Sequence, residues 1–593
     1  MSGVLCDVLR LPVIGKTLCP TSAPRFDHMK TREPLLREFY LKRLFGHGLA
    51  GLLAAPFLLA ACLAQVSVPL YHNDRQRSGH NTEETRLTPH NVNVKHFGKL
   101  FSQPVDGYIY AQPLYQEDVV LANKSVHNVV FVATMNDSVY AFDADSNTGG
   151  NAKPLWQAIF INPSLGITPV PTADVGCSDI ITPEIGILST PVLDPIGGTL
   201  YVLARTKESG QYVQRLHALD IGSGAEKFGG PVVIQASVPG TGSGSSGGVI
   251  HFQPLIQNQR SALLLQGGLV YIAWGSHCDA GAYHGWLMAY GATTLQPAGV
   301  WVTTPNGSRG AIWESGNGPA GDASDHVYVA IGNGTFDVNN SGIDYGQSIV
   351  KLSTPTQGTF SVLDYFTPYN ALNLDPEDMD IGSGGAALLP NQDSGPNIHL
   401  LVQADKEGTI YLVNRDQMGH YNPNNNDQIV QWIPKAELGM WNSPALLDNT
   451  VYLGANGDYL KAFSFKSSTG LLSVTPASQT TNTFGYPGTT PSISSDKHRN
   501  GIVWALDNSS YKNTSGAVLY AYDAANLATE LYSSNQDAAR DNPGPAVKFA
   551  VPTVANGRVY VGTQTQLSVF GLGSAAPVST VAPAANAPRT GPD

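Results

Sequence analysis

The sequence predicts an all-β protein, and three features of its composition lead to that fold class. Only 13% of the 593 residues are charged, which is about half the share in an average soluble domain. Glycine and proline occur 62 and 40 times, so the chain is rich in turns. The low charge excludes coiled coils and long helices, and the 42% of hydrophobic residues excludes general disorder. What remains is a protein of many short strands.

A repeated pair of strands runs through the chain and predicts the architecture. The first copy, residues 129–143, reads as a strand, a tight polar turn and a second strand. Further copies follow at a spacing of about 60 residues, a period that indicates β-propeller blades. They are residues 199–220, 269–290, 326–352, 399–413, 450–463, 501–523 and 558–570. We therefore expect an eight-bladed β-propeller of four-stranded antiparallel blades.

The ring has a physical reason, because a single blade cannot bury both of its faces. Radial stacking of blades buries those faces and leaves only short sheet edges. The last copy lacks an outermost strand, and residues 97–102 have the pattern of that strand. We expect this N-terminal strand to close the ring. The alternative architecture, two stacked β-sandwiches, leaves the regular repeat unexplained.

The predicted boundaries are residues 1–64 for a leader, 65–572 for the propeller and 573–593 for a tail. The tail is rich in Ala, Pro, Ser and Thr, a composition typical of disorder. In the leader, two basic residues precede the apolar run 49–61, which has the length of a signal-peptide core. This run is too short to span a bilayer comfortably. We therefore expect an exported protein.

Two interpretations of the cleavage site remain open. Residues 59–62 resemble a bacterial lipobox, in which Cys62 carries the lipid that anchors the protein to a membrane. A cut after Ala64 leaves a protein without an anchor. Met29 begins a signal peptide of more ordinary length, so residues 1–28 are interpreted as an over-extended start. The expected location is periplasmic, outer-membrane-anchored or extracellular.

The cysteines and the net charge narrow the list of partners and compartments. Cys177 and Cys278 are the two cysteines of the predicted propeller, and thiols in an oxidising compartment often pair. They are far apart in sequence, so the sequence leaves their pairing open. The net charge of −12 offers no electrostatic footprint for nucleic acid.

The repeats resemble the blades of the quinoprotein alcohol dehydrogenase-like superfamily. Blades of that family typically end in Ala-x-Asp-x-x-Thr-Gly followed by Trp. The first repeat matches this pattern, with a longer turn, at Ala141, Asp143, Thr148, Gly149 and Trp156. The resemblance covers nearly the whole predicted propeller and implies eight blades. A blade motif specifies a fold rather than an activity.

A second resemblance concerns the site at the propeller axis. Enzymes of this family bind pyrroloquinoline quinone (PQQ) and Ca²⁺ there, and an Asp takes the alcohol proton as hydride moves to the quinone. The Gly-Asn at residues 332–333 resembles a calcium-binding Gly-Asn of the family, so Asn333 is a candidate ligand. Asp380 precedes a Gly-rich strand, as the family's catalytic base does, and Lys406 matches the cation that contacts the quinone. With one residue of slack, Asp279 matches the remaining carboxylate ligand.

These residue types suit the chemistry. Ca²⁺ prefers six to eight oxygen ligands, a carboxylate base must reach the substrate hydroxyl, and a lysine can hold an anionic quinone by charge-assisted hydrogen bonds. Each candidate also has a structural interpretation. Asn333 can be a turn residue, Asp380 can belong to a solvated acidic loop, and Lys406 can lie in a surface turn.

The chain also departs from the family. Its enzymes commonly carry a disulfide between two adjacent cysteines on the cofactor, and this sequence has no adjacent cysteine pair. Trp313, the candidate for the aromatic that supports the quinone, lies a few residues too early. It can equally be an aromatic that packs blades together. The arginine that binds the cofactor carboxylates has no counterpart after a cysteine pair.

Two functions therefore remain open. The first is a PQQ- and Ca²⁺-dependent dehydrogenase of an alcohol or a sugar, and it predicts that the polar candidates converge at one mouth of the channel. The second is a cofactor-free envelope protein whose propeller binds a protein or a polysaccharide. It predicts a blocked channel or scattered candidates, with exposed aromatics such as Tyr108 and Tyr110 grouped elsewhere. Membrane contact is expected only through a lipid anchor.

Overall fold

The computed structural model describes residues 66–177 and 184–573, which all belong to one compact unit of the chain. The leader, with Cys62 and both cleavage sites, lies outside the described residues, and so does the tail from residue 574. Within the described part, no helix is long and apolar enough to cross a membrane.

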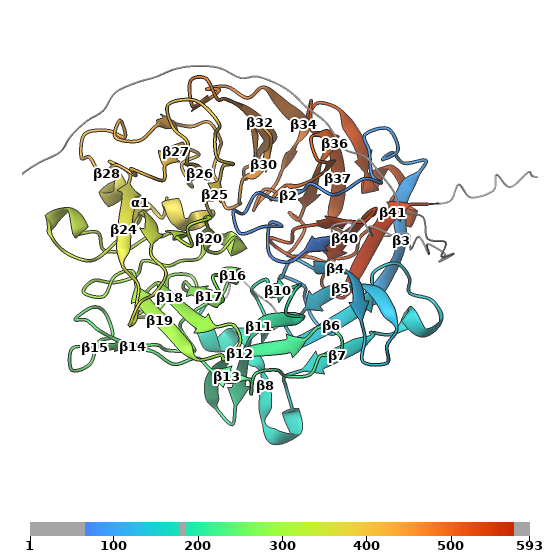
Figure 1. The fold of residues 1–593 in the computed structure, drawn as a ribbon, viewed down its shortest axis with the longest axis horizontal. Helices are drawn as coiled ribbons and strands as arrows, with labels where there is room; N and C mark the ends of the chain where they lie inside the picture. Colours follow the sequence, from blue (N-terminus) through green and yellow to red (C-terminus); the bar gives the residue numbers. More distant parts are fainter. Residues whose placement is uncertain (1–65, 178–183, 574–593) are drawn as a thin grey trace, which may run out of the picture. The chain divides into compact units, whose positions relative to one another are not determined.

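Eight antiparallel blades follow one another around a ring in chain order (Figure 1). Blade 1 consists of β4 (Leu114–Val120), β5 (Val126–Ala133), β6 (Ser138–Asp143) and β7 (Trp156–Ile159). Blade 2 consists of β10 (Val192–Asp194), β11 (Thr199–Glu208), β12 (Gln211–Asp220) and β13 (Val232–Val233). Blade 3 consists of β16 (Leu264–Gln266), β17 (Leu269–Trp274), β18 (Trp286–Gly291) and β19 (Pro297–Val302). Blade 4 consists of β20 (Ala320–Gly321), β21 (Val327–Ala330), β22 (Ile349–Leu352) and β24 (Val362–Thr367).

The second half of the ring repeats this arrangement. Blade 5 consists of β25 (Ala387–Leu388), β26 (Leu400–Ala404), β27 (Ile410–Asn414) and β29 (Gln431–Ile433). Blade 6 consists of β30 (Ala445–Leu447), β31 (Thr450–Gly454), β32 (Asp458–Lys466) and β34 (Ser478–Phe484). Blade 7 consists of β35 (Ser492–Asp496), β36 (Arg499–Asp507), β37 (Val518–Asp523) and β38 (Glu530–Ser533). Blade 8 consists of β39 (Thr553–Ala555), β40 (Arg558–Gly562), β41 (Gln566–Leu572) and β3 (Phe97–Pro104). Every predicted repeat is the pair of middle strands of one blade, so the eight-bladed prediction is confirmed.

Further short strands and helices lie outside the four-stranded blades. The additional strands are β1 (Ser67–Val68), β2 (His80–Asn81), β8 (Ile167–Pro171), β9 (Glu184–Ile185), β14 (Ser237–Pro239), β15 (Val249–His251), β23 (Gly358–Thr359), β28 (His420–Tyr421) and β33 (Leu471–Leu472). The α-helices of the described residues are α1 (Ala371–Glu377) and α2 (Ala538–Asp541).

Ring closure uses the predicted N-terminal strand. β3 pairs antiparallel with β41, from Phe97 opposite Leu572 to Pro104 opposite Gln566. It is therefore the outermost strand of a blade whose other three strands end the described chain. The inner strand β39 in turn contacts β4 of blade 1. This pairing joins the two ends of the propeller, which leaves no open side in the ring.

The core lies between neighbouring blades, because each blade is apolar on both faces. All six residues of β6 are buried. Between blades 4 and 5, Tyr328 and Phe366 pack with Leu401 and Tyr411. Strands covered on both sides read as continuous hydrophobic runs rather than alternating ones, and this is the pattern of the repeats.

A segment before blade 1 runs along the inner edges of the blades. Carbonyls of residues 69–79 accept hydrogen bonds from backbone N–H groups of inner strands in blades 2, 4, 5, 6 and 7. The donors are Leu193, Gly321, Leu388, Leu446 and Ile493. Polar groups that the short inner edges would otherwise expose are thereby satisfied. Arg77, which belongs to this segment, is fully buried.

Strand direction decides which connections share a face of the ring. Adjacent strands of a blade alternate in direction, so the loop between its second and third strands lies at the same end as the link to the next blade. Side chains from these two kinds of connection can therefore meet near the axis.

Candidate functional site at the axis

A cavity of about 330 Å³ lies at that end of the ring, and we call it the axial cavity. Its volume falls in the range of small-molecule sites. The lining comes from connections of blades 3 to 8, which can meet only near the axis. The lining residues are Asn258, Ser276, Cys278, Asp279, Ala311, Trp313, Asn333, Asp378, Asp380, Lys406, Trp441, Tyr486 and Lys548. All five sequence candidates are among them.

One side of the axial cavity is acidic and contains a buried lysine. Lys406 Nζ lies 2.7 Å from Asp378 Oδ1 and 2.6 Å from Asp380 Oδ1. The side chains of Lys406 and Asp380 are each 11% exposed, whereas that of Asp378 is 69% exposed. Lys406 Nζ also lies 5.9 Å from the ring centroid of Trp441, within the range of a cation–π contact. The ammonium is therefore held on three sides.

Burial and charge shift the two inner groups of this ion pair. Burial raises the pKa of the Asp380 carboxyl; Lys406 lowers it again, and Asp378 and Asp279 raise it further, so that the pKa ends above its usual value. Burial alone would lower the pKa of Lys406, but its contacts with Asp380 and Asp378 more than offset that effect and leave the pKa raised. Asp380 thus has the raised pKa that suits a general base, and Lys406 stays charged.

The amide of Asn333 is oriented by its neighbours. The backbone N–H of Ile381 donates to Gln347 Oε1 at 3.1 Å, so the amide nitrogen of Gln347 faces Asn333 and donates to its Oδ1 at 2.8 Å. The Asn333 nitrogen then points to the acidic side, where it donates to Asp378 Oδ1 at 2.7 Å and to Asp279 Oδ2 at 3.5 Å. The carboxylates therefore meet an N–H donor rather than the amide oxygen of Asn333.

The glycine of the Gly-Asn motif makes room for the candidate base. A Cβ atom on Gly332 would lie 2.5 Å from Asp380 Oδ2. A Cβ on Gly382, two residues after Asp380, would lie 2.3 Å from the backbone nitrogen of Gly332. Real Cβ atoms do not approach other atoms this closely. The two glycines therefore let Asp380 pack against the end of β21.

Asp279 and the disulfide form the wall from blade 3. Asp279 Oδ1 accepts hydrogen bonds from Ser276 Oγ at 2.9 Å and from Tyr283 Oη at 2.6 Å. The preceding residue, Cys278, forms a disulfide with Cys177 across 101 positions of sequence, with Cα atoms 5.9 Å apart. The pairing that the sequence leaves open thus exists. Disulfides of this kind are typical of an oxidising compartment.

The opposite side of the axial cavity is aromatic and basic. Lys548 is buried, and its Nζ lies 4.8 Å from the ring centroid of Tyr486 and 5.1 Å from that of Phe549. Phe549 also contacts Trp313 edge to face at 5.4 Å. Arg260, behind this layer, has its guanidinium carbon 5.5 Å from the Phe549 ring. The cavity therefore has an acidic half and an aromatic half with cations.

A strained turn positions Trp313. Glu314 and Ser315, the next two residues, both have φ near 50°, a conformation that costs energy and is found mainly at functional sites. Glu314 accepts a hydrogen bond from the backbone N–H of Ala330 at 2.7 Å, and burial raises its pKa to about 8. Ser315 donates to the carbonyl of Ser383 at 2.6 Å. These contacts fix the turn between blades 3 and 4.

Sequence reasoning missed several residues of the axial cavity. Asp378, Trp441, Tyr486 and Lys548 were not among the predicted site residues. Each lies in a link between two blades, the same position that Trp313 and Asp380 occupy. The sequence could have indicated them if every link between consecutive blades had been treated as a possible part of the site. Tyr110, expected to be exposed if the propeller were a scaffold, is instead buried beneath Arg260, and Tyr108 is half-buried.

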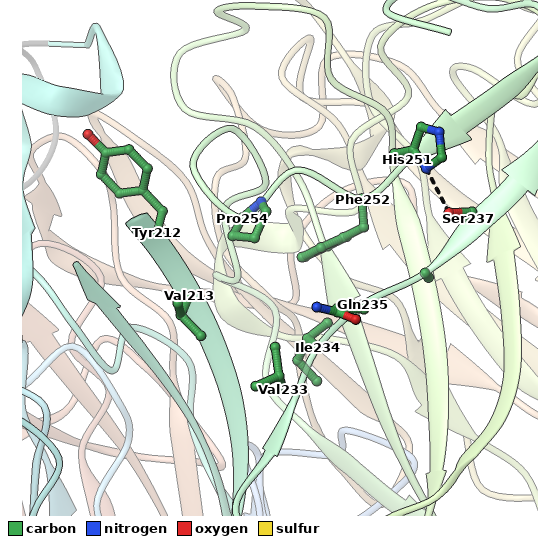
Figure 2. Close-up of a pocket in the computed structure, with 10 residues that line it drawn as sticks. Tyr212, Val213, Val233, Ile234, Gln235, Ser237, His251, Phe252 and Pro254 are labelled. Atoms are coloured by element: carbon green, nitrogen blue, oxygen red, sulfur yellow. Dashed lines mark hydrogen bonds between the residues drawn. The ribbon is translucent and has the colours of Figure 1, made fainter. Parts of the chain in front are cut away.

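A second pocket, of about 470 Å³, lies between blade 2 and the β14–β15 hairpin (Figure 2). Ser237 Oγ and His251 Nδ1 are 2.8 Å apart across that hairpin. Both side chains are exposed, and no Asp, Glu, Lys or Arg is among the described residues that line the pocket. Of these two pockets, only the axial cavity is lined by charged side chains. We therefore take the axial cavity as the candidate site.

Solved structures with a similar fold exist for the whole propeller. The chain is similar to the quinohemoprotein alcohol dehydrogenase ADHIIG from Pseudomonas putida HK5, at 14% identity and a TM-score of 0.53, over 88% of this chain and 82% of that one. It is similar to the quinohemoprotein alcohol dehydrogenase from Comamonas testosteroni, at 16% identity and a TM-score of 0.52, over 89% and 82%. It is also similar to a europium-containing methanol dehydrogenase, at 11% identity and a TM-score of 0.54, over 85% and 98%. The chain therefore shares the propeller fold of these dehydrogenases.

The likeness extends to the fold and stops there, because sequence identity is low. No protein-family model matches the sequence, and no curated protein sequence matches it. Among the described residues, no group of three or more His, Cys, Asp or Glu side chains is arranged to hold a metal ion. What this fold does in the chain has to be argued from the axial cavity itself.

Proposed function

We propose that the protein binds a planar, anionic quinone of the PQQ type in the axial cavity and oxidises an alcohol or a sugar there. One observation carries the proposal. The five residues that the family resemblance singles out, from Asp279 to Lys406, all line one cavity of about 330 Å³. Scattered residues or a filled axis would instead favour a scaffold.

The lining suits the organic cofactor. Aromatic faces at Trp313, Trp441 and Tyr486 offer stacking surfaces, and Lys406 and Lys548 offer positive charge for carboxylates or a reduced quinone. The Cys177–Cys278 disulfide reaches the same cavity through Cys278, although the family's adjacent pair is absent. The lining suits Ca²⁺ less well, because Asn333 turns its N–H toward the carboxylates.

Within this proposal the roles of the chain's residues follow from their contacts. A bound quinone would supply the acceptor for two electrons from the substrate carbon. Asp380 takes the proton of the substrate hydroxyl, and Lys406, 2.6 Å away, keeps the carboxylate oriented and its charge balanced. The aromatic half of the cavity excludes water from the reacting atoms. We also propose that the protein acts after export, which the disulfide supports.

A quinone titration tests the proposal. Purified protein should bind PQQ saturably at one site, followed by quinone absorbance and by a rise in Tm. Lys406→Ala and Lys548→Ala should each weaken binding about tenfold or more, because each removes a charge-assisted contact. Lys466→Ala, at an exposed position on β32, should leave the affinity unchanged. Absence of binding at tens of micromolar PQQ would refute the proposal, and the partner would then be a protein or polysaccharide of the envelope.

Gly332→Ala should damage the axial cavity by displacing Asp380. The new methyl group would overlap Asp380 Oδ2, and a shift of about 1 Å in a reacting group can cost about 10²-fold in rate. The stability loss should not exceed the usual cost of overpacking, about 1–3 kcal/mol. Gly150→Ala is the matched control, since nothing lies within 4 Å of its Cβ. Turnover with PQQ and thermal unfolding of both variants measure the effect, and full activity in Gly332→Ala would contradict it.

A further inference from the structure

Three carboxylates share the acidic half of the axial cavity, and they need a positive charge nearby. Asp279 Oδ2 and Asp378 Oδ1 are bridged by one amide nitrogen, that of Asn333. Asp378 and Asp380 are bridged by one ammonium, that of Lys406. Like charges this close destabilise one another unless a cation compensates them. In a quinoprotein of the usual kind a divalent metal ion supplies this charge.

Lys406 already places a positive charge between two of these carboxylates. Its ammonium contacts two carboxylates at 2.6 and 2.7 Å and is covered by the Trp441 ring. The turn that carries it is fixed by Asp405, which accepts hydrogen bonds from the N–H of Thr409 at 2.9 Å and from Tyr411 Oη at 2.7 Å. At the Oδ1 atoms of Asp378 and Asp380, a metal ion would have to displace this held ammonium.

The orientation of the Asn333 amide also disfavours a metal ion. Ca²⁺ binds oxygen, so Asn333 would have to turn its Oδ1 toward the carboxylates. Its nitrogen would then face the nitrogen of Gln347, which cannot turn without losing the hydrogen bond from Ile381. Two donors facing each other in a buried place would leave both unsatisfied, at a cost of about 1–3 kcal/mol each.

We infer that the ammonium of Lys406 supplies the positive charge that the acidic half of the axial cavity needs, so that this half is charge-balanced without a bound metal ion. The charge balance concerns the protein alone. Its consequence, that the quinone is bound without Ca²⁺, rests on the proposed function. Lys406 is then a positioning residue for Asp380 and an internal counter-ion.

Calcium titration of the cofactor-free protein tests the inference without any quinone. The purified full chain is treated with a chelator and desalted, and Ca²⁺ is then followed by titration calorimetry and by Tm. Wild-type protein should show no saturable binding below about 1 mM, the limit of weak calcium sites. Lys406→Met removes the internal cation and keeps the side-chain length. This variant should gain saturable Ca²⁺ binding with a Kd of about 10⁻⁴–10⁻³ M and a matching rise in Tm.

Two matched variants separate this effect from a general change of charge. Lys548→Met removes the same charge from another residue of the axial cavity, outside the cluster of Asp378, Asp380 and Lys406, and should remain insensitive to Ca²⁺. Lys406→Arg keeps a cation between the carboxylates and should also remain insensitive. If Lys406→Met does not fold, Lys406→Gln provides the same test and keeps hydrogen-bond donors to Asp378 and Asp380.

Two results would overturn the inference. One is saturable binding of Ca²⁺ to wild-type protein below about 1 mM that Asp380→Asn abolishes. The other is a folded Lys406→Met or Lys406→Gln that gains no response. The quinone titration, repeated with and without chelator, keeps the two proposals apart. Binding that needs Ca²⁺ contradicts only the role of Lys406, whereas no binding in either condition contradicts only the proposed function.

Discussion

Asp380→Asn is expected to lower turnover with PQQ and an alcohol or sugar by about 10²–10⁴-fold, the usual contribution of a general base. Asn has the shape of Asp but cannot accept the substrate proton. Because Asp380 is buried and packed against Gly332, an isosteric change should leave the cavity intact. PQQ affinity should therefore stay close to that of the wild type, whereas Tm should fall, because the buried ammonium of Lys406 loses one of its two carboxylate partners. A variant that retained more than about a tenth of the activity would show that Asp380 is not the base.

Asp378→Asn is the matched control for this change. Asp378 contacts the same ammonium at nearly the same distance, but its side chain is 69% exposed and lies at the rim. We expect its replacement to lower turnover by less than about tenfold, because solvent screens the lost charge. Equal losses in the two variants would assign the effect to the orientation of Lys406 rather than to proton transfer.

The pH dependence of the rate should identify the same group. The base must be ionised to accept a proton, and burial raises the pKa of Asp380 above its usual value. The rate should therefore be constant at higher pH and fall as the pH drops through this raised pKa. The acidic limb should be absent from the residual activity of Asp380→Asn.

Arg77→Met is expected to cause the largest loss of stability, about 3–5 kcal/mol in the free energy of unfolding. The guanidinium donates to the carbonyls of Tyr71 at 2.9 Å, Leu263 at 3.2 Å and Pro319 at 2.9 and 3.1 Å. Methionine fills the space but leaves all three buried carbonyls without this donor. Urea unfolding should show a lower midpoint with an unchanged slope.

Two further variants define the cause. Arg77→Lys keeps the charge but lacks the planar set of donors, so its stability should lie between those of wild type and Arg77→Met. Arg86→Met changes an exposed arginine that follows the N-terminal segment of residues 69–79 and should stay within about 0.5 kcal/mol of wild type. If Arg77→Met were as stable as Arg86→Met, the N-terminal segment would not be held through Arg77.

The sequence alone determined the architecture because blade formation is a local matter. Strand pairs such as residues 129–143 contain their own turns and their own hydrophobic runs. Each copy repeats this pattern of strand, turn and strand. Closure by residues 97–102 was also predictable, since a missing outer strand has to be supplied from elsewhere and the pattern of β3 fits. The candidate site residues came from the resemblance of their motifs to those of a known enzyme family, in the same order along the blades.

Tertiary structure decided what the site contains and how its atoms face. Trp441, Tyr486 and Lys548 come from links far apart in sequence, and only the alternating strand directions bring these links to one end of the ring. The pairing of Cys177 with Cys278 needed a Cα separation that no local pattern encodes. The ammonium of Lys406 between two carboxylates, and the amide of Asn333 turned by Gln347, are set by packing. The repeats determine which residue types stand near the axis. The orientations of their side chains and the charge balance of the axial cavity arise only when six blades meet there.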